Sequence, residues 1–120
     1  MPIQEKIAKA KRIQLEQQIA SEIAKITKRN TGKGPRCTKA RILEDIIEIY
    51  MDGFLTDLEH CLLENEENRG LIEELRKALR NTMHQAYIEI LSPMLQMNLR
   101  ILHVHMDIQK DSCKITLIIV

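Results

Sequence analysis

The C-terminal end of the chain carries the pattern that most restricts the fold. Residues 99–109 place Leu102, Val104, Met106 and Ile108 in alternation with His103, His105, Asp107 and Gln109. A period of two is typical of a β-strand with one apolar and one polar face. The polar residues 110–112 then predict a turn, and the apolar residues 113–120 predict a second strand. These residues therefore predict an antiparallel hairpin, whose apolar face is expected to be covered by helices.

A long amphipathic helix is predicted at the other end of the chain, from Ile3 to about Lys28. This stretch contains no Pro or Gly and is rich in good helix formers. Its apolar residues fall mostly three or four apart, at Ile3, Ile7, Ala10, Leu15, Ile19, Ile23 and Ile26. Such spacing makes one apolar stripe. The stripe must pack either on the body of the domain or on another subunit.

Residues 37–51 are ambiguous, because Ile42, Ile46 and Ile49 also fit a helical stripe. The residues are nevertheless dense in β-branched side chains, and Glu44-Asp45 divides them as a hairpin turn would. We interpret the segment as two short strands.

The middle of the chain predicts two further helices. Thr56 to Glu59 has the pattern of a capping box, which starts a short helix through about Leu63, and a loop is expected from Glu64 to Gly70. The second helix has its apolar stripe at Ile72, Leu75, Leu79, Met83, Ala86 and Ile90. Ser92-Pro93 is expected to kink or interrupt this helix, with a last turn to Met97.

Together these elements predict an α+β fold of two layers. An antiparallel sheet of about four strands, from two hairpins, is packed by two to three helices. We expect residues 1–30 to form an assembly arm and residues 31–120 to form the domain itself. Of the 120 residues, 44% are hydrophobic but only 2% are aromatic, so the core must consist mainly of Ile and Leu.

Charge is divided unevenly along the chain. Residues 1–41 contain 11 Lys or Arg and three Glu, a net charge of +8, whereas the remaining 79 residues carry a net charge of −7. Such asymmetry favours a segment that docks on the acidic half of the same fold or of a second copy, or else an arm that binds an anionic partner. We therefore expect a homodimer or a higher homo-oligomer, with Leu15, Ile19, Ile23 and Ile26 in the assembly contact.

The basic loop after the first helix is the strongest candidate for binding. Its candidate residues are Lys28, Arg29, Lys33, Gly34, Arg36 and Lys39. Glycines let backbone amides approach an anion closely, so phosphate or nucleic acid is a possible ligand. The loop lacks the Lys-Ser/Thr pair of a Walker P-loop and has no stacking aromatics. A solvated connection between helix and strand is the alternative.

A metal site on the last hairpin is a weaker hypothesis. His103, His105 and Asp107 share one strand face, and Cys113 joins them if the register allows. The alternative is an ordinary wet face of the sheet. We expect no cofactor, and no arrangement of residues predicts an enzyme. Three cysteines at no metal-like spacing, with no signal peptide or membrane-spanning segment expected, favour the reducing cytoplasm.

Several short motifs, taken in order, resemble the MpsC-like domain family. They are Gly32-Lys33-Gly34-Pro35, Asp45 between two short strands, Gly53-Phe54-Leu55-Thr56 with Glu59, Gly70 with Arg76, and His105-Met106-Asp107. One departure is Asn98, where the family tends to have Gly; Asn tolerates a left-handed backbone, so the turn is expected to persist.

The resemblance implies an accessory or regulatory role beside a sodium-translocating, membrane-potential-generating system. It supplies no catalytic or binding residues. On this interpretation the chain is a non-enzymatic interaction domain in the cytoplasm, held near the membrane only through a protein partner such as a transport subunit.

Overall fold

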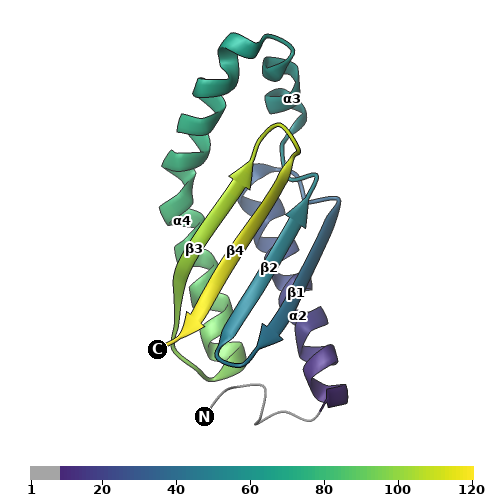
Figure 1. Cartoon of the computed structure of the whole chain (residues 1–120), viewed down its shortest axis with the longest axis vertical. Coiled ribbons are helices and arrows are strands. Elements are labelled where there is room, and N and C mark those ends of the chain that lie inside the picture. The colour runs from purple at the N-terminus through teal and green to yellow at the C-terminus, as the bar shows by residue number, and fades with distance from the viewer. Residues whose placement is uncertain (1–8) are drawn as a thin grey trace.

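The computed structural model describes residues 9–120 and confirms the α+β fold, with one four-stranded sheet and helices packed on it (Figure 1). The elements in order are α2 (Lys9–Thr31), β1 (Cys37–Leu43), β2 (Ile46–Asp52), α3 (Asp57–Leu63), the 3₁₀ turn η1 (Glu66–Asn68), α4 (Arg69–Leu95), β3 (Leu99–Asp107) and β4 (Ser112–Ile119).

Two hairpins form the sheet, as expected, and they join edge to edge in the order β1-β2-β4-β3. All three pairings are antiparallel. The first hairpin turns at Glu44, which adopts a positive φ of 56°. The two strands expected in residues 37–51 are thus confirmed, and β1 and β3 are left as the sheet edges.

Both long helices lie on one face of the sheet (Figure 1). Helix α2 ends at Thr31, three residues later than expected, and the expected helical residues 3–8 lie outside the described part of the chain. Ile19, Ile23 and Ile26 have no exposed surface and belong to the core beneath the sheet. The core consists mainly of isoleucine and leucine side chains, as expected, and Phe54 and Tyr87 are its aromatic residues.

Helix α4 differs from its prediction in two respects. It continues through Ser92 and Pro93 to Leu95, so of the two expected effects, a kink or an interruption, the interruption is wrong. Its expected stripe is also partly wrong, because Leu75 and Ile90 are 43% and 36% exposed. The buried positions are Ile72, Arg76, Met83, Tyr87, Leu91 and Leu95. The buried face therefore includes a charged residue, Arg76, whose partner is described below.

Three local predictions are corrected by the structure. The expected loop over residues 64–70 instead contains η1, and α4 already begins at Arg69. The left-handed residue after α4 is Gln96, with φ of 55°, and not Asn98. In β3 the pairing shifts between Ile101 and His103. This bulge leaves Leu102 52% exposed, so Leu102 does not join Val104 on the core face.

The capping box at Thr56 is confirmed. The Thr56 hydroxyl accepts from the Glu59 N–H, and the Glu59 carboxylate accepts from the Thr56 N–H. Helix α3 and the start of α4 project beyond the end of the sheet, which gives an elongated molecule of 49 × 24 × 21 Å (Figure 1).

Candidate functional site

The basic loop is held by its own contacts at the end of the sheet. Gly32 ends α2 with a φ of +85°, and its N–H donates to the Lys28 carbonyl at 2.8 Å. The Lys33 ammonium donates to the Leu55 carbonyl at 2.8 Å. Lys33 therefore directs its charge to a backbone group of the following turn rather than presenting it freely to a ligand.

Arg36 is tied to the same turn through two contacts. Its guanidinium lies 2.8 Å from the Asp52 carboxylate, and its backbone N–H donates to the Gly53 carbonyl at 3.2 Å. The hydrogen bond and the charge of Asp52 raise the pKa of Arg36. Gly53 has a φ of +66°, and a Cβ there would lie 2.6 Å from the Arg36 Cβ. This close approach explains why a glycine is needed at residue 53.

Asp111, from the turn between β3 and β4, joins three segments at this end. Its backbone carbonyl accepts from the Gly53 N–H at 2.8 Å, and its carboxylate accepts from the Leu55 N–H at 2.8 Å. The second carboxylate oxygen lies 3.1 Å from His60 Nε2 on α3. Asp111 thus links the last hairpin to the segment that starts α3.

A buried ion pair fixes α4 to the same segment. The Arg76 guanidinium binds the Glu59 carboxylate, with Nε 2.8 Å from Oε2, and also donates to the Phe54 carbonyl at 3.2 Å. Arg76 lies 5.0 Å from the centre of the Phe54 ring. Burial by itself raises the pKa of Glu59, but the bonds from Arg76 and Thr56 outweigh it and lower that pKa below its ordinary value.

Several of the motifs on which the resemblance rests therefore lie close together. The Gly53–Thr56 segment contacts the glycine-containing basic loop on one side and Glu59 and Arg76 on the other, at the α3 end of the sheet. These contacts bond the charged groups to one another and to backbone. The arrangement is a structural junction, which we call the motif junction.

A comparison with protein-family models identifies the family of the chain. The family model described as "Na+-translocating membrane potential-generating system (MpsC)" matches residues 11–120. The chain belongs to the MpsC family. Comparison with curated proteins and with solved structures gave no match. In residues 9–120, no helix is both long and apolar enough to cross a membrane.

The remaining candidate anion ligands of this MpsC-family chain lie apart from the motif junction's contacts. Lys28 and Arg29 are exposed in the last turn of α2. Lys39 is exposed on β1, on the face of the sheet that the helices leave open. Gly34 packs its backbone near the Lys28 side chain. The six residues do not converge on a single site, because Lys33 and Arg36 are engaged internally.

The histidine strand does not bring its four candidate ligands together. His103 and His105 are exposed on β3. Cys113 pairs with Met106 in the register and is buried on the opposite, core face of the sheet. Asp107 instead accepts from the Lys110 N–H at 3.0 Å. Among residues 9–120, no group of three His, Cys, Asp or Glu side chains has the geometry to hold a metal.

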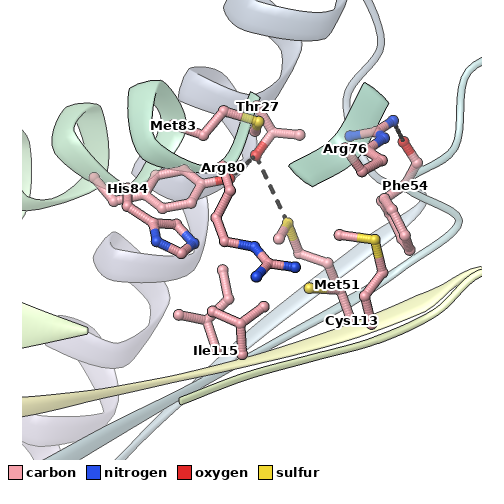
Figure 2. A pocket seen from close by; sticks show the side chains of 12 residues that line it. Thr27, Met51, Phe54, Arg76, Arg80, Met83, His84, Cys113 and Ile115 are labelled. Carbon is pink, nitrogen blue, oxygen red and sulfur yellow. Dashed lines mark hydrogen bonds between the residues drawn. The ribbon is translucent and has the colours of Figure 1, made fainter. Parts of the chain in front are cut away.

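A small cavity lies beside the motif junction, between α2, α4 and the sheet (Figure 2). Its volume is about 40 Å³, enough for a few water molecules only. Inside it the hydroxyls of Thr27 and Tyr87 lie 2.9 Å apart. Burial raises the pKa of Tyr87 to about 12 and that of Cys113 to about 11. Both groups are therefore protonated and unreactive as nucleophiles at neutral pH.

Arg80 adds a positive charge to the lining of the cavity. Figure 2 shows the Arg80 side chain extending toward Met51 and Ile115, with His84 beside it. Burial, followed by the charge of Arg80, lowers the pKa of His84 below its ordinary value. The lining of the cavity is thus mainly apolar, with Arg80 and the Glu59-paired Arg76 as its two cations.

The predicted assembly contact is occupied by the chain itself. Of the two alternatives for the isoleucine stripe of α2, the structure shows the packing on the domain body. Ile19, Ile23 and Ile26 are fully buried, and Leu15 packs partly buried against the same core. In this conformation the three isoleucines offer no surface to a partner, and α2 packs on the sheet.

Sequence reasoning missed Asp111, Thr27 and Tyr87 as organising residues. Arg76 gave a usable signal, because it lies one turn after Ile72 on the apolar side of α4. A charged residue at a core position requires a buried partner of opposite charge. The partners of Asp111 and Tyr87 give no such signal, since they lie 51 to 60 residues away in the chain.

Proposed function

We propose that the chain is a non-enzymatic, cytoplasmic interaction component of a sodium-translocating, membrane-potential-generating system. The observation that carries the proposal is the match of the MpsC family model to residues 11–120. It is supported by the state of the buried nucleophiles, since Cys113 and Tyr87 are protonated, and by Glu59, whose carboxylate is bonded to Arg76. The free, exposed thiols of Cys37 and Cys61 fit a reducing compartment.

Surfaces suited to contacts with other chains support the interaction role. One face of the sheet carries α2 and α4, whereas the other face presents alternate side chains of all four strands (Figure 1). Around the projecting end, Leu58 on α3 and Leu71 on α4 are 68% and 58% exposed. Exposed leucines of this kind are also consistent with self-association, so we retain a homo-oligomer in the proposal.

The proposal is tested by co-purification from native host membranes and lysate. Two copies of the chain with different tags are expressed together, and each is purified after mild solubilisation with nuclease. We expect a membrane-transport subunit to co-purify, together with the other tagged copy. If only the tagged chain is recovered, as a monomer, both the membrane-system role and self-association are wrong.

Anion or nucleic-acid binding through the basic loop is the second candidate. One observation favours it: in residues 9–120 no salt bridge is found for Lys28, Arg29 or Lys39. The internal bonds of Lys33 and Arg36 count against it, because they remove two of the expected cations from a shared site.

A further inference from the structure

The edge strand β1 and helix α2 enclose an open groove of about 400 Å³. Ile13, Gln17 and Ala20 form its helical wall, and Thr38 and Ala40 form its strand wall. Ile13 is 45% exposed there, whereas Ile19, Ile23 and Ile26 further along α2 are buried. The groove is therefore a place where the helix leaves the edge of the sheet accessible.

Backbone groups of β1 point into this groove. The Ile42 N–H donates to the Glu16 carboxylate at 2.7 Å, so the peptide groups of Ile42 face away from β2. In an antiparallel pair, successive residues alternate between facing the partner strand and facing outward. Thr38 and Ala40 therefore also face outward. Among residues 9–120, no group outside the sheet accepts a hydrogen bond from the backbone N–H of Thr38 or Ala40.

A second polar group in the groove has no partner. The Thr38 hydroxyl is buried and makes no hydrogen bond within the described chain. A buried hydroxyl without a partner is unfavourable, so a polar group of a bound ligand would be stabilising beside it. Glu16 already occupies the Ile42 end of the edge with a carboxylate. The open part of the edge is thus confined to the stretch that contains Thr38 and Ala40.

The rim of the groove carries two positive charges, which favour an acidic ligand. Lys39 and Arg41 alternate with Thr38 and Ala40 and point to the open face of the sheet. Neither cation has a salt bridge among residues 9–120. Opposite charges on facing strand positions stabilise a pairing, and like charges destabilise it. A second copy of β1 paired about Ala40 would set Lys39 against Arg41, so the charges disfavour that occupant.

We propose that this groove binds a short, extended, acidic segment of a partner protein by strand addition to β1. The segment pairs with the backbone of Thr38 and Ala40, directs alternate acidic side chains to Lys39 and Arg41, and places small apolar side chains against Ile13 and Ala20. The inference rests on the proposed interaction function and names the surface and the partner chemistry for it.

The test uses a fluorescein-labelled heptapeptide of alternating Val and Glu, titrated with the full chain in a polarisation assay. We expect it to bind, and we expect the Val/Lys counterpart not to bind. Two further peptides are methylated, one at the Val amide nitrogens and one at the Glu amide nitrogens, which keeps the charge but removes the N–H donors of one edge at a time. The peptide methylated on the edge that faces β1 is expected not to bind. If both methylated peptides bind as well as the parent, charge alone accounts for binding and strand addition is wrong.

Variants locate the site. Lys39→Glu with Arg41→Glu is expected to weaken binding at least tenfold, and Arg100→Glu, on the other edge strand, is the matched control expected to leave it unchanged. Amide hydrogen exchange on the wild-type chain is expected to slow at Thr38 and Ala40 when the Val/Glu peptide binds. No binding, or slowed exchange on other elements alone, overturns the inference.

The co-purification assay separates this inference from the proposed function. A partner recovered equally with the wild-type chain and with the Lys39→Glu, Arg41→Glu variant leaves the function standing and rejects the groove. A partner lost only from this variant, whose fold is checked by circular dichroism, supports both. Failure of the wild-type chain to recover any partner rejects the function itself.

Discussion

The lack of a side chain at Gly53 allows Arg36 of the basic loop to pack against the end of the sheet. Its φ is positive, and a Cβ at this residue would lie 2.6 Å from the Arg36 Cβ, so there is no room for a side chain. Gly70 provides the contrast, because a Cβ there meets no atom within 4 Å. The two glycines therefore serve different purposes despite belonging to the same set of motifs.

We expect Gly53→Ala to lower the free energy of unfolding by about 2 kcal/mol or more, from the left-handed backbone and the contact with Arg36. Gly70→Ala, in the first turn of α4, is expected to raise it by about 0.5 kcal/mol. Urea denaturation followed by circular dichroism measures both. Equal effects of the two substitutions would contradict the role assigned to Gly53.

The Glu59–Arg76 pair predicts a pH-dependent stability. Because the pKa of Glu59 is lowered on folding, its contribution is complete above the ordinary value of 4.5 and is lost as the pH falls through the folded-state pKa. Glu59→Gln leaves Arg76 buried without its counter-charge and is expected to cost about 3–5 kcal/mol at pH 7.

The measurement compares urea unfolding of the wild type and Glu59→Gln at pH 7 and at successively lower pH. The difference between them is expected to shrink in acid, as Glu59 itself becomes protonated. Glu73→Gln, in the exposed pair with Arg69, is the control and is expected to change stability by less than about 0.5 kcal/mol. A difference that stays constant with pH would mean that the charge of Glu59 is not what stabilises α4.

At the scale of elements, α2 is the helix whose role the structure defines most clearly. Its isoleucines cover the sheet, and its Thr27 hydroxyl contacts both Tyr87 of α4 and the Met51 sulfur of β2. Helix α2 thus contacts both the other long helix and the sheet. Removing it would expose the apolar face of β1 and β2.

Ile19→Asp with Ile23→Asp is expected to unfold the whole domain, because it places two carboxylates at positions with no exposed surface. Ile23→Ala alone is expected to cost about 2–5 kcal/mol, and Ile13→Ala, at a 45% exposed position, much less. Circular dichroism and light scattering distinguish the outcomes. If the double variant stays folded and changes only its oligomeric state, the apolar stripe of α2 forms the contact between subunits and this prediction is wrong.

At the scale of the whole molecule, the charge asymmetry of the chain is only partly neutralised by internal pairs. Lys33 and Arg36 are engaged at the motif junction, whereas Lys28 and Arg29 remain exposed at the end of α2. The acidic residues of α3, η1 and the start of α4 surround the projecting end of the molecule (Figure 1). The charges therefore remain available for contacts with other molecules.

Salt dependence distinguishes anion binding from protein contacts. Under the anion-binding alternative, affinity for a labelled single-stranded oligonucleotide is expected to fall roughly 10-fold or more between 50 and 200 mM salt. Replacing Lys28 and Arg29 by Ala should reduce the slope of log K against log salt by about 1.4. The matched control is Lys77→Ala with Lys110→Ala. Undetectable binding at 50 mM salt, or an equal slope change in the control, would reject this site.

The sequence by itself determined the element order, both hairpins and the Thr56 capping box. These features depend on residues two to four positions apart, and the short-range periodicity of side chains records them directly. The same short range explains the errors. Periodicity placed Leu75 and Ile90 on the buried stripe of α4, and alternation placed Leu102 on the core face of β3.

Only the tertiary structure decided how the polar residues are used. The contacts of Lys33 with Leu55, of Arg76 with Glu59, and of Thr27 with Tyr87 join residues 17 to 60 positions apart. No local pattern encodes such pairs, because they form only when the helices and the sheet have packed. Packing therefore engaged Lys33 and Arg36 of the basic loop in internal bonds and buried Ile19, Ile23 and Ile26 of α2 against the sheet.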